Sequence, residues 1–159
     1  MKSKLVVFIL FAFVVSISAQ EVNVPVKVKD AFAKMHPTAK DVKWGKEGKK
    51  EFEAEFKENG IATSLVFNRE GKLLETETVI KVTELPKGAA EYVAKTHSGY
   101  TISEAAKIVN AKKMITYEAE VTKGKEKKDL FFTVDGKPIV KKETHDNDEE
   151  KGENAPKHK

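Results

Sequence analysis

The chain has 159 residues, and its 29 basic side chains nearly balance its 25 acidic ones, leaving a formal net charge of +4. Arg69 is the one arginine, and because arginine is the preferred reader of phosphates and guanine, we expect no nucleic-acid partner. The chain has no cysteine, which excludes disulfides, thiolate metal sites and lipid attachment at a cysteine.

Residues 1–19 have the pattern of an export signal. The basic residues Lys2 and Lys4 precede an apolar run from Leu5 to Val15, and small residues up to Ala19 offer a cleavage point. The run is shorter than the roughly 20 apolar residues that span a bilayer. We therefore predict a signal peptide over residues 1–19, no retained transmembrane segment, and a periplasmic or secreted location.

The other end of the chain is almost free of apolar side chains from Lys141 onward. Such a segment cannot offset the entropy cost of ordering, so we predict a disordered charged tail over residues 143–159. The part between the signal and the tail, about 120 residues, suits one compact domain or two small units that share a core.

The first predicted element is a helix from about Val26 to His36, with Pro25 in its first turn and Pro37 at its end. After it the apolar spacing changes from helical to alternating, which indicates strands. They are expected at Val42 to Trp44, 51–57, 61–67 and 72–82. The sequences Asn59-Gly60 and Glu70-Gly71 supply turns between them.

The second half of the chain has a similar series. A helix is expected after Pro86, ending near Ser98-Gly99, with strands at 102–110, 114–122, 127–134 and 137–140. Short motifs recur 61 to 65 positions apart. Val24-Pro25 recurs as Leu85-Pro86, Glu53-Ala54-Glu55 as Glu118-Ala119-Glu120, and Gly71-Lys72 as Gly136-Lys137.

This repetition predicts an α+β fold of two tandem repeats. Each repeat is expected to be a helix followed by a roughly four-stranded antiparallel sheet, with the helices packed on one sheet face. The boundaries are expected at residues 20–83 and 84–142. The other sheet face is left to solvent or to a partner, as antiparallel sheets permit.

The repeated motifs also resemble a known family. The run VPVKVKDAFAKMHPTAKDVKWGKEGKKEFEAEF, and FFTVDGKPI in the second half, resemble the PepSY-like family of exported bacterial proteins. That family is also described as similar to the beta-lactamase inhibitory protein fold. The resemblance covers about residues 22 to 142. It implies tandem helix-plus-sheet units in an exported protein, and by fold analogy the binding or inhibition of another protein.

Paired carboxylates are the main candidates for chemistry. Glu53 and Glu55 point to one side of their strand, about 7 Å apart, and Glu118 and Glu120 are their counterparts. That separation is compatible with an inverting glycosidase or with weak calcium binding. Alternation of Glu with apolar residues is also typical of a half-buried strand with a solvated face, which is the reading that we favour.

Two apolar residues fall on the same strand sides as these carboxylates. Val66 and Phe131 lie opposite the core-facing residues of their strands and are expected to be apolar anchors within a polar rim. Trp44 is expected to pack on the core with Val42. The histidines His36 and His97 occupy matching helix ends without the spacing of metal ligands, so we expect no metal site and no cofactor.

The leading functional hypothesis is an exported, monomeric, non-enzymatic binding protein. It would use its open sheet face against an envelope or extracellular protein, in the sharpest version an enzyme that it inhibits. The expected partner-binding residues are Glu53, Glu55, Val66, Glu118, Glu120 and Phe131. The first alternative is a small-ligand or divalent-cation module built on the paired strand carboxylates. The second is a carbohydrate-active enzyme that uses the same carboxylates.

Overall fold

The computed structural model describes residues 22–140 of the chain. The expected signal peptide at 1–19 and the expected tail at 143–159 lie outside the described residues. Within the described part, no helix is long and apolar enough to cross a membrane.

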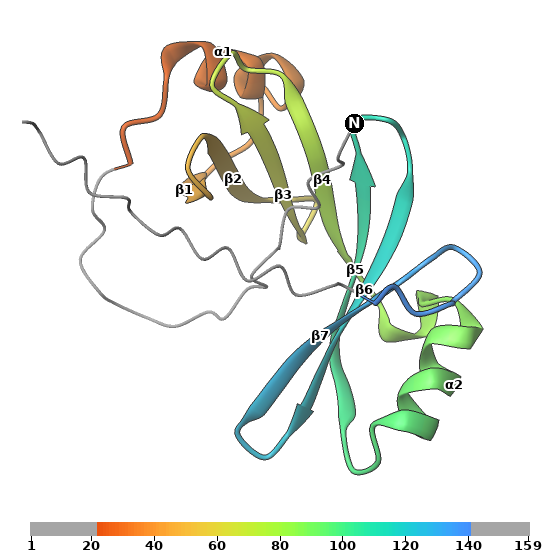
Figure 1. The fold of residues 1–159 in the computed structure, drawn as a ribbon. Coiled ribbons are helices and arrows are strands. Elements are labelled where there is room, and N and C mark those ends of the chain that lie inside the picture. The colour runs from red at the N-terminus through yellow and green to blue at the C-terminus, as the bar shows by residue number, and fades with distance from the viewer. Residues whose placement is uncertain (1–21, 141–159) are drawn as a thin grey trace, which may run out of the picture.

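The described part is mostly β structure, with two α-helices and one short 3₁₀ helix (Figure 1). The helices are α1 (Val26–Met35), η1 (Val82–Glu84) and α2 (Lys87–Thr96). The strands are β1 (Lys43–Glu47), β2 (Glu51–Glu58), β3 (Ile61–Asn68), β4 (Leu73–Ile80), β5 (Thr101–Asn110), β6 (Ile115–Lys123) and β7 (Glu126–Phe132).

All seven strands form one antiparallel sheet in the order of the sequence, β1 to β7. The predicted pair of tandem helix-plus-sheet repeats is therefore wrong. The finding that overturns it is the pairing of β4 with β5, which runs from Glu75↔Asn110 to Ile80↔Ala105. Because an unpaired strand edge exposes N–H and C=O groups, joining two edges satisfies both, and one continuous sheet results.

The last predicted strand, at 137–140, is not formed. Its only ladder contact is an isolated bridge between Phe132 and Pro138, accompanied by a hydrogen bond from the Ile139 amide to the Phe131 carbonyl (2.7 Å). Proline has no amide proton and cannot continue a ladder, so the chain touches β7 without extending the sheet.

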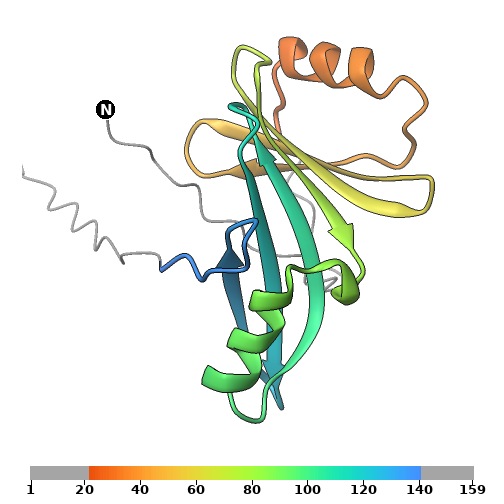
Figure 2. The same cartoon turned by 90° about the vertical axis from the view of Figure 1, so that its right-hand side faces the viewer.

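Both helices pack on the same face of the sheet, at its two ends (Figure 2). Under α1, Val28 and Phe32 contact a cluster that includes Phe52, Phe56 and Phe67. Under α2, the apolar cluster consists of Leu85, Ala89, Val93, Ala105, Ala119, Val121 and Phe132. Trp44 and Val42 pack against the first cluster, as the sequence predicted.

The sheet is strongly curled, in the manner of a half-barrel (Figure 1). Side chains on the helix-free face of a flat, open sheet would be exposed to water. Here several of them are buried, among them Ser64, Val66 and Ile108. Each of these three has 6% or less of its surface exposed. The middle of the helix-free face is therefore shielded from water, and this face holds the candidate site.

Candidate functional site: a carboxylate-lined sheet face

Acidic side chains from five of the strands point to the helix-free face. The alternation in β2 sends Phe52, Ala54 and Phe56 to the helices, so Glu53 and Glu55 lie on the other side. The register carries this side across the sheet, through Glu53↔Val66 and Val66↔Glu75, to Glu118↔Phe131. We call this surface the carboxylate face: Glu53, Glu55, Glu75, Glu77, Glu104, Glu118, Glu120 and Asp129.

The structure brings all six predicted partner-binding residues to this one face: Glu53, Glu55, Val66, Glu118, Glu120 and Phe131. The expectation that Val66 is an exposed anchor is wrong, because only 1% of it is exposed. Val66 lies on β3, one of the middle strands, where the face is shielded from water. Phe131, on the last strand, is half-buried. Phe131 is thus the apolar residue of this set that a partner can reach.

Glu77 of β4 is a strongly perturbed carboxyl of the face. It is 6% exposed, and its Oε2 atom has no hydrogen-bond partner among residues 22–140. Its pKa is raised to about 8, mainly by burial and in smaller part by the charges of Glu53, Glu75, Glu104 and Asp129. The protonated form is therefore the favoured one at neutral pH.

Glu53 of β2 shares this environment. Its pKa is raised to about 7, mainly by burial and in smaller part by the charges of Glu55 and Glu47. The nearby hydroxyl of Ser64 acts in the opposite direction on the pKa. Glu53 is the register partner of Val66 and Glu77 is that of Ser64, so these two perturbed carboxyls lie on the two strands that flank β3.

Glu120 of β6 is equally buried but has partners. Its carboxylate accepts hydrogen bonds from the Ser103 hydroxyl (2.6 Å) and from the Lys127 ammonium (3.0 and 3.2 Å). Burial alone would raise its pKa, but the bonds from Ser103 and Lys127 and the charge of Lys127 outweigh that effect and lower the pKa. Glu120 is thus an ionised carboxylate whose charge is balanced by Lys127.

The middle of the face and its last strand interact electrostatically. Glu77 lies on β4 and Asp129 on β7, three strands apart, which in a flat sheet is about 14 Å. The charge of Asp129 nevertheless raises the pKa of Glu77. The carboxylate face is therefore an inward-curving surface on which charges from distant strands interact.

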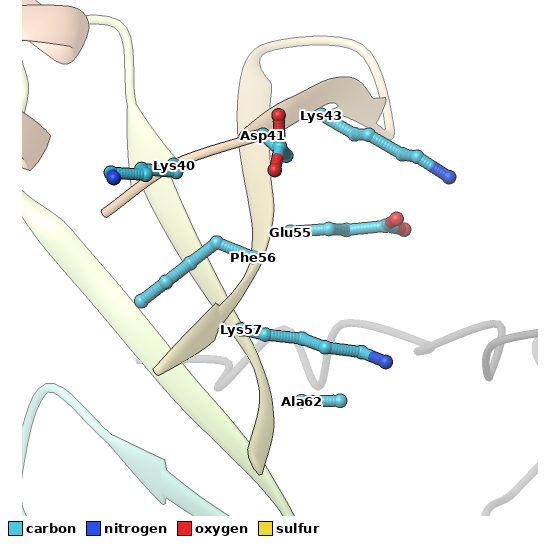
Figure 3. A pocket seen from close by; sticks show the side chains of 7 residues that line it. All are labelled: Lys40, Asp41, Lys43, Glu55, Phe56, Lys57 and Ala62. Carbon is cyan, nitrogen blue, oxygen red and sulfur yellow. The ribbon is translucent and has the colours of Figure 1, made fainter. Parts of the chain in front are cut away.

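A pocket of about 280 Å³ lies beside this face, at the β1 end of the sheet (Figure 3). In Figure 3 the side chains of Lys43, Glu55 and Lys57 extend to one side and Phe56 to the other. Lys43 is the register partner of Glu55, and its charge opposes the rise that burial causes in the pKa of Glu55. Lysines thus balance the carboxylate here, in contrast to the middle of the face.

The arrangement is not that of a metal centre. Within residues 22–140, no group of three or more His, Asp or Glu side chains is placed to hold a metal ion. Calcium needs six to eight oxygens at 2.3–2.6 Å, a much closer convergence than neighbouring strands give here. The His36 ring lies instead against Phe32 and Phe56 and pairs with Glu58 (3.2 Å).

Glu77 was missed by the sequence reasoning, although a signal for it exists. In the segment Leu74-Glu75-Thr76-Glu77-Thr78, acidic residues alternate as they do in β2. The alternation alone places Glu75 and Glu77 on one strand side. It does not say that β4 is a central strand, and that position is what buries Glu77.

Comparison with solved structures identifies similar folds. No family model matches the chain, and no curated protein matches it either. A DUF2874 family protein from Bacteroides uniformis ATCC 8492 is 25% identical with a TM-score of 0.64, over 73% of this chain and 86% of that chain. A structure from Bacteroides eggerthii DSM 20697, described as "putative periplasmic proteins", is 22% identical with a TM-score of 0.65, over 73% and 86% of the two chains.

A third solved structure has an informative description. It is a BLIP-like protein from Bacteroides fragilis NCTC 9343, 21% identical with a TM-score of 0.57, over 77% of this chain and 88% of that chain. The likeness supports a fold of the beta-lactamase-inhibitory-protein type, which is one part of the resemblance noted in the sequence. The descriptions of these structures do not confirm the PepSY part.

Proposed function

We propose that the chain is an exported, non-enzymatic binding protein that holds a segment of another protein against its carboxylate face. The observation that carries the proposal is the inward-curving sheet face, free of helices, with buried carboxyls in its middle and the half-buried Phe131 at one end. Aromatic side chains next to desolvated polar groups are typical of interface hot spots.

The comparisons support this proposal at the level of the fold. One similar structure is described as BLIP-like and another as a periplasmic protein. A fold likeness transfers function weakly, so the carboxylate face itself is the main argument. The predicted signal at residues 1–19 supports a periplasmic or secreted location. The most specific form of the proposal is that the partner is an enzyme and that the chain inhibits it.

A photo-crosslinking experiment in the native host tests the proposal. The crosslinking analogue p-benzoylphenylalanine replaces Phe131 on the carboxylate face and, as the matched control, Met35, an exposed residue at the end of α1. We expect a discrete crosslinked product from position 131 and none from position 35. The same product from position 35 alone, or no product from position 131, would refute the use of this face.

A substitution gives an independent arm of the same test. Phe131→Asp adds a charge at the reachable apolar residue and should abolish the product, here captured through an analogue at Lys127, which lies on the same strand. Thermal unfolding of the variant checks that the fold persists. A folded Phe131→Asp variant with an undiminished product would count against a role for Phe131.

A further inference from the structure

The middle of the carboxylate face holds acidic side chains in a place that water solvates poorly. Glu77 and Glu120 are each 6% exposed. Glu120 has Ser103 and Lys127 as partners, whereas the Oε2 atom of Glu77 has no hydrogen-bond partner within residues 22–140. A buried carboxyl oxygen without a hydrogen-bond partner costs free energy, so its retention calls for an explanation.

The charges that surround Glu77 have one predominant sign. Among residues 22–140, lysines face this side of the sheet only near its ends, where Lys43 lies opposite Glu55 and Lys127 binds Glu120. The charged groups on this side, strand by strand, are Lys43 and Glu47; Glu51, Glu53, Glu55 and Lys57; Glu75 and Glu77; Glu104; Glu118 and Glu120; and Lys127 and Asp129. The complement to such a surface is a cation.

Apolar groups beside these carboxyls restrict the kind of cation. Val66 lies between Glu53 and Glu75 across the strands, Ile108 is the register partner of Glu77, and Phe131 is that of Glu118. Lysine and arginine carry an alkyl stem that packs on apolar surface while the charged end reaches polar groups. A divalent metal has no such stem, and the described residues offer it no set of three ligands.

We propose that the carboxylate face receives a lysine or arginine side chain from the bound segment of the partner protein, with the cation between Glu53 and Glu77. This inference rests on the proposed function and names the chemistry that the partner must present. The ammonium or guanidinium donates hydrogen bonds to the unpartnered Glu77 and to Glu53, near Ser64. Its stem lies toward the half-buried Phe131, the apolar residue of this face that a partner can reach.

Binding of such a side chain is expected to depend on pH. The cation favours the ionised carboxylates, whereas in the unbound protein burial and mutual repulsion hold Glu53 and Glu77 largely protonated at pH 6. Binding must therefore release protons, and affinity must rise with pH up to about 8.5. For two coupled carboxyls the rise between pH 6 and pH 8.5 is expected to be about ten-fold or more.

The test is a selection from a library of short random peptides with the full mature protein, followed by synthesis of the selected sequences. We expect one position to be fixed as Lys or Arg. Replacing that residue by norleucine should lower the affinity about ten-fold or more, since norleucine keeps the stem and lacks the charge. The affinity for the unmodified peptide should be weaker at pH 6 than at pH 8.5.

Variants of the protein locate the effect. The double variant Glu53→Gln, Glu77→Gln should lose the preference for a cation and the dependence on pH. Glu70→Gln, in the exposed turn between β3 and β4, is the matched control and should retain both. Amide chemical shifts that change on β2, β3 and β4 upon peptide binding would place the peptide on the carboxylate face.

Other outcomes overturn the inference in distinguishable ways. If selected peptides bind this face without a cationic residue, the proposed function stands, but the inference that the partner presents a lysine or arginine is refuted. Peptides that bind only elsewhere would count against the proposed function itself. Spermidine or calcium binding as tightly as the peptide would indicate a free cation as the ligand, and a dimer in sedimentation would indicate a second copy of the chain.

Discussion

Ser64 and Glu77 are register partners on the neighbouring strands β3 and β4, and both are buried on the sheet face that carries no helix. A strand pair in an open sheet would leave them in water. Here the curl of the sheet removes that water, so the burial of a single carboxyl is coupled to the curvature of the whole sheet. The consequences of that coupling are measurable in stability.

The stability of the protein is expected to fall as pH rises from about 5 to 8.5. The folded-state pKa of Glu77 is about 8 and that of Glu53 about 7, both above the value of 4.5 for an unperturbed glutamate. The folded state therefore binds more protons than the unfolded state in this range, and the free energy of unfolding decreases with pH. For Glu77 the loss is roughly 3–4 kcal/mol.

Urea denaturation at a series of pH values measures this slope, and the melting temperature should drop by more than about 10 °C over the same range. Above pH 8.5 the curve should level off, because both carboxyls are then ionised in both states. A flat or rising profile between pH 5 and pH 8 would show that these two carboxyls are not buried as described.

Glu77→Gln should stabilise the protein at high pH. The amide keeps the shape of the side chain and cannot ionise, so the cost of a buried charge disappears. We expect a gain of about 2 kcal/mol or more at pH 8.5 and a change below about 1 kcal/mol at pH 5, where Glu77 is already neutral. The exposed-turn variant Glu70→Gln should change neither value. Equal effects of Glu77→Gln at both pH values would contradict ionisation as the cause.

Lys127→Met should have the opposite dependence on pH. It leaves the Glu120 carboxylate with Ser103 alone. Since 55% of the Lys127 side chain is exposed, solvent screens the pair, and we expect a loss of only about 1 kcal/mol at pH 7. The pKa of Glu120 is lowered in the folded state, so its contribution is present above about pH 4.5 and is lost as the pH falls further.

Chemical denaturation at pH 7 and at pH 3 compares the two conditions for Lys127→Met. The loss should shrink toward zero at pH 3, where Glu120 is protonated. Lys112→Met, in the exposed turn between β5 and β6, is the control and should lie within about 0.5 kcal/mol of the wild type at both values. A loss that persists at pH 3 would point to packing by the Lys127 stem.

The local elements could be predicted from the sequence because their signals are local. Pro25 and Pro86 precede helices that begin at Val26 and Lys87, within a residue of the pattern. Asn59 and Gly60 form the expected tight turn, both with positive φ. The alternation in β2 and β6 also assigned Glu53, Glu55, Glu118 and Glu120 to the correct strand sides.

The sheet could not be predicted, because its decisive pairing is not local. Between Ile80 of β4 and Thr101 of β5 the chain forms η1 and α2. Periodicity describes one strand and does not name its partner. Two separate sheets and one continuous sheet therefore have the same alternation, and the burial of Val66 and Glu77 follows only from the continuous, curled one.

The repeated Gly-Lys dipeptides have a structural reason that the sequence did not reveal. A Cβ at Gly71 would lie 2.5 Å from the Lys27 carbonyl oxygen, in the first turn of α1. A Cβ at Gly136 would lie 2.8 Å from the Ala89 amide nitrogen, in the first turn of α2. Each turn thus lies directly against the helix that covers its end of the sheet.

Gly71→Ala is expected to be much more destabilising than Gly60→Ala, and the two positions form a matched pair. Both glycines have a φ of +80°, so an alanine pays a similar backbone strain of about 1–2 kcal/mol at either position. A Cβ at Gly60 meets nothing within 4 Å, whereas at Gly71 it meets the backbone of α1. Because α1 must shift to admit it, Gly71→Ala should cost at least about 2 kcal/mol more in urea denaturation. Equal costs at the two positions would show that the turn does not lie against α1, and the docking of that helix on the sheet would need a different basis.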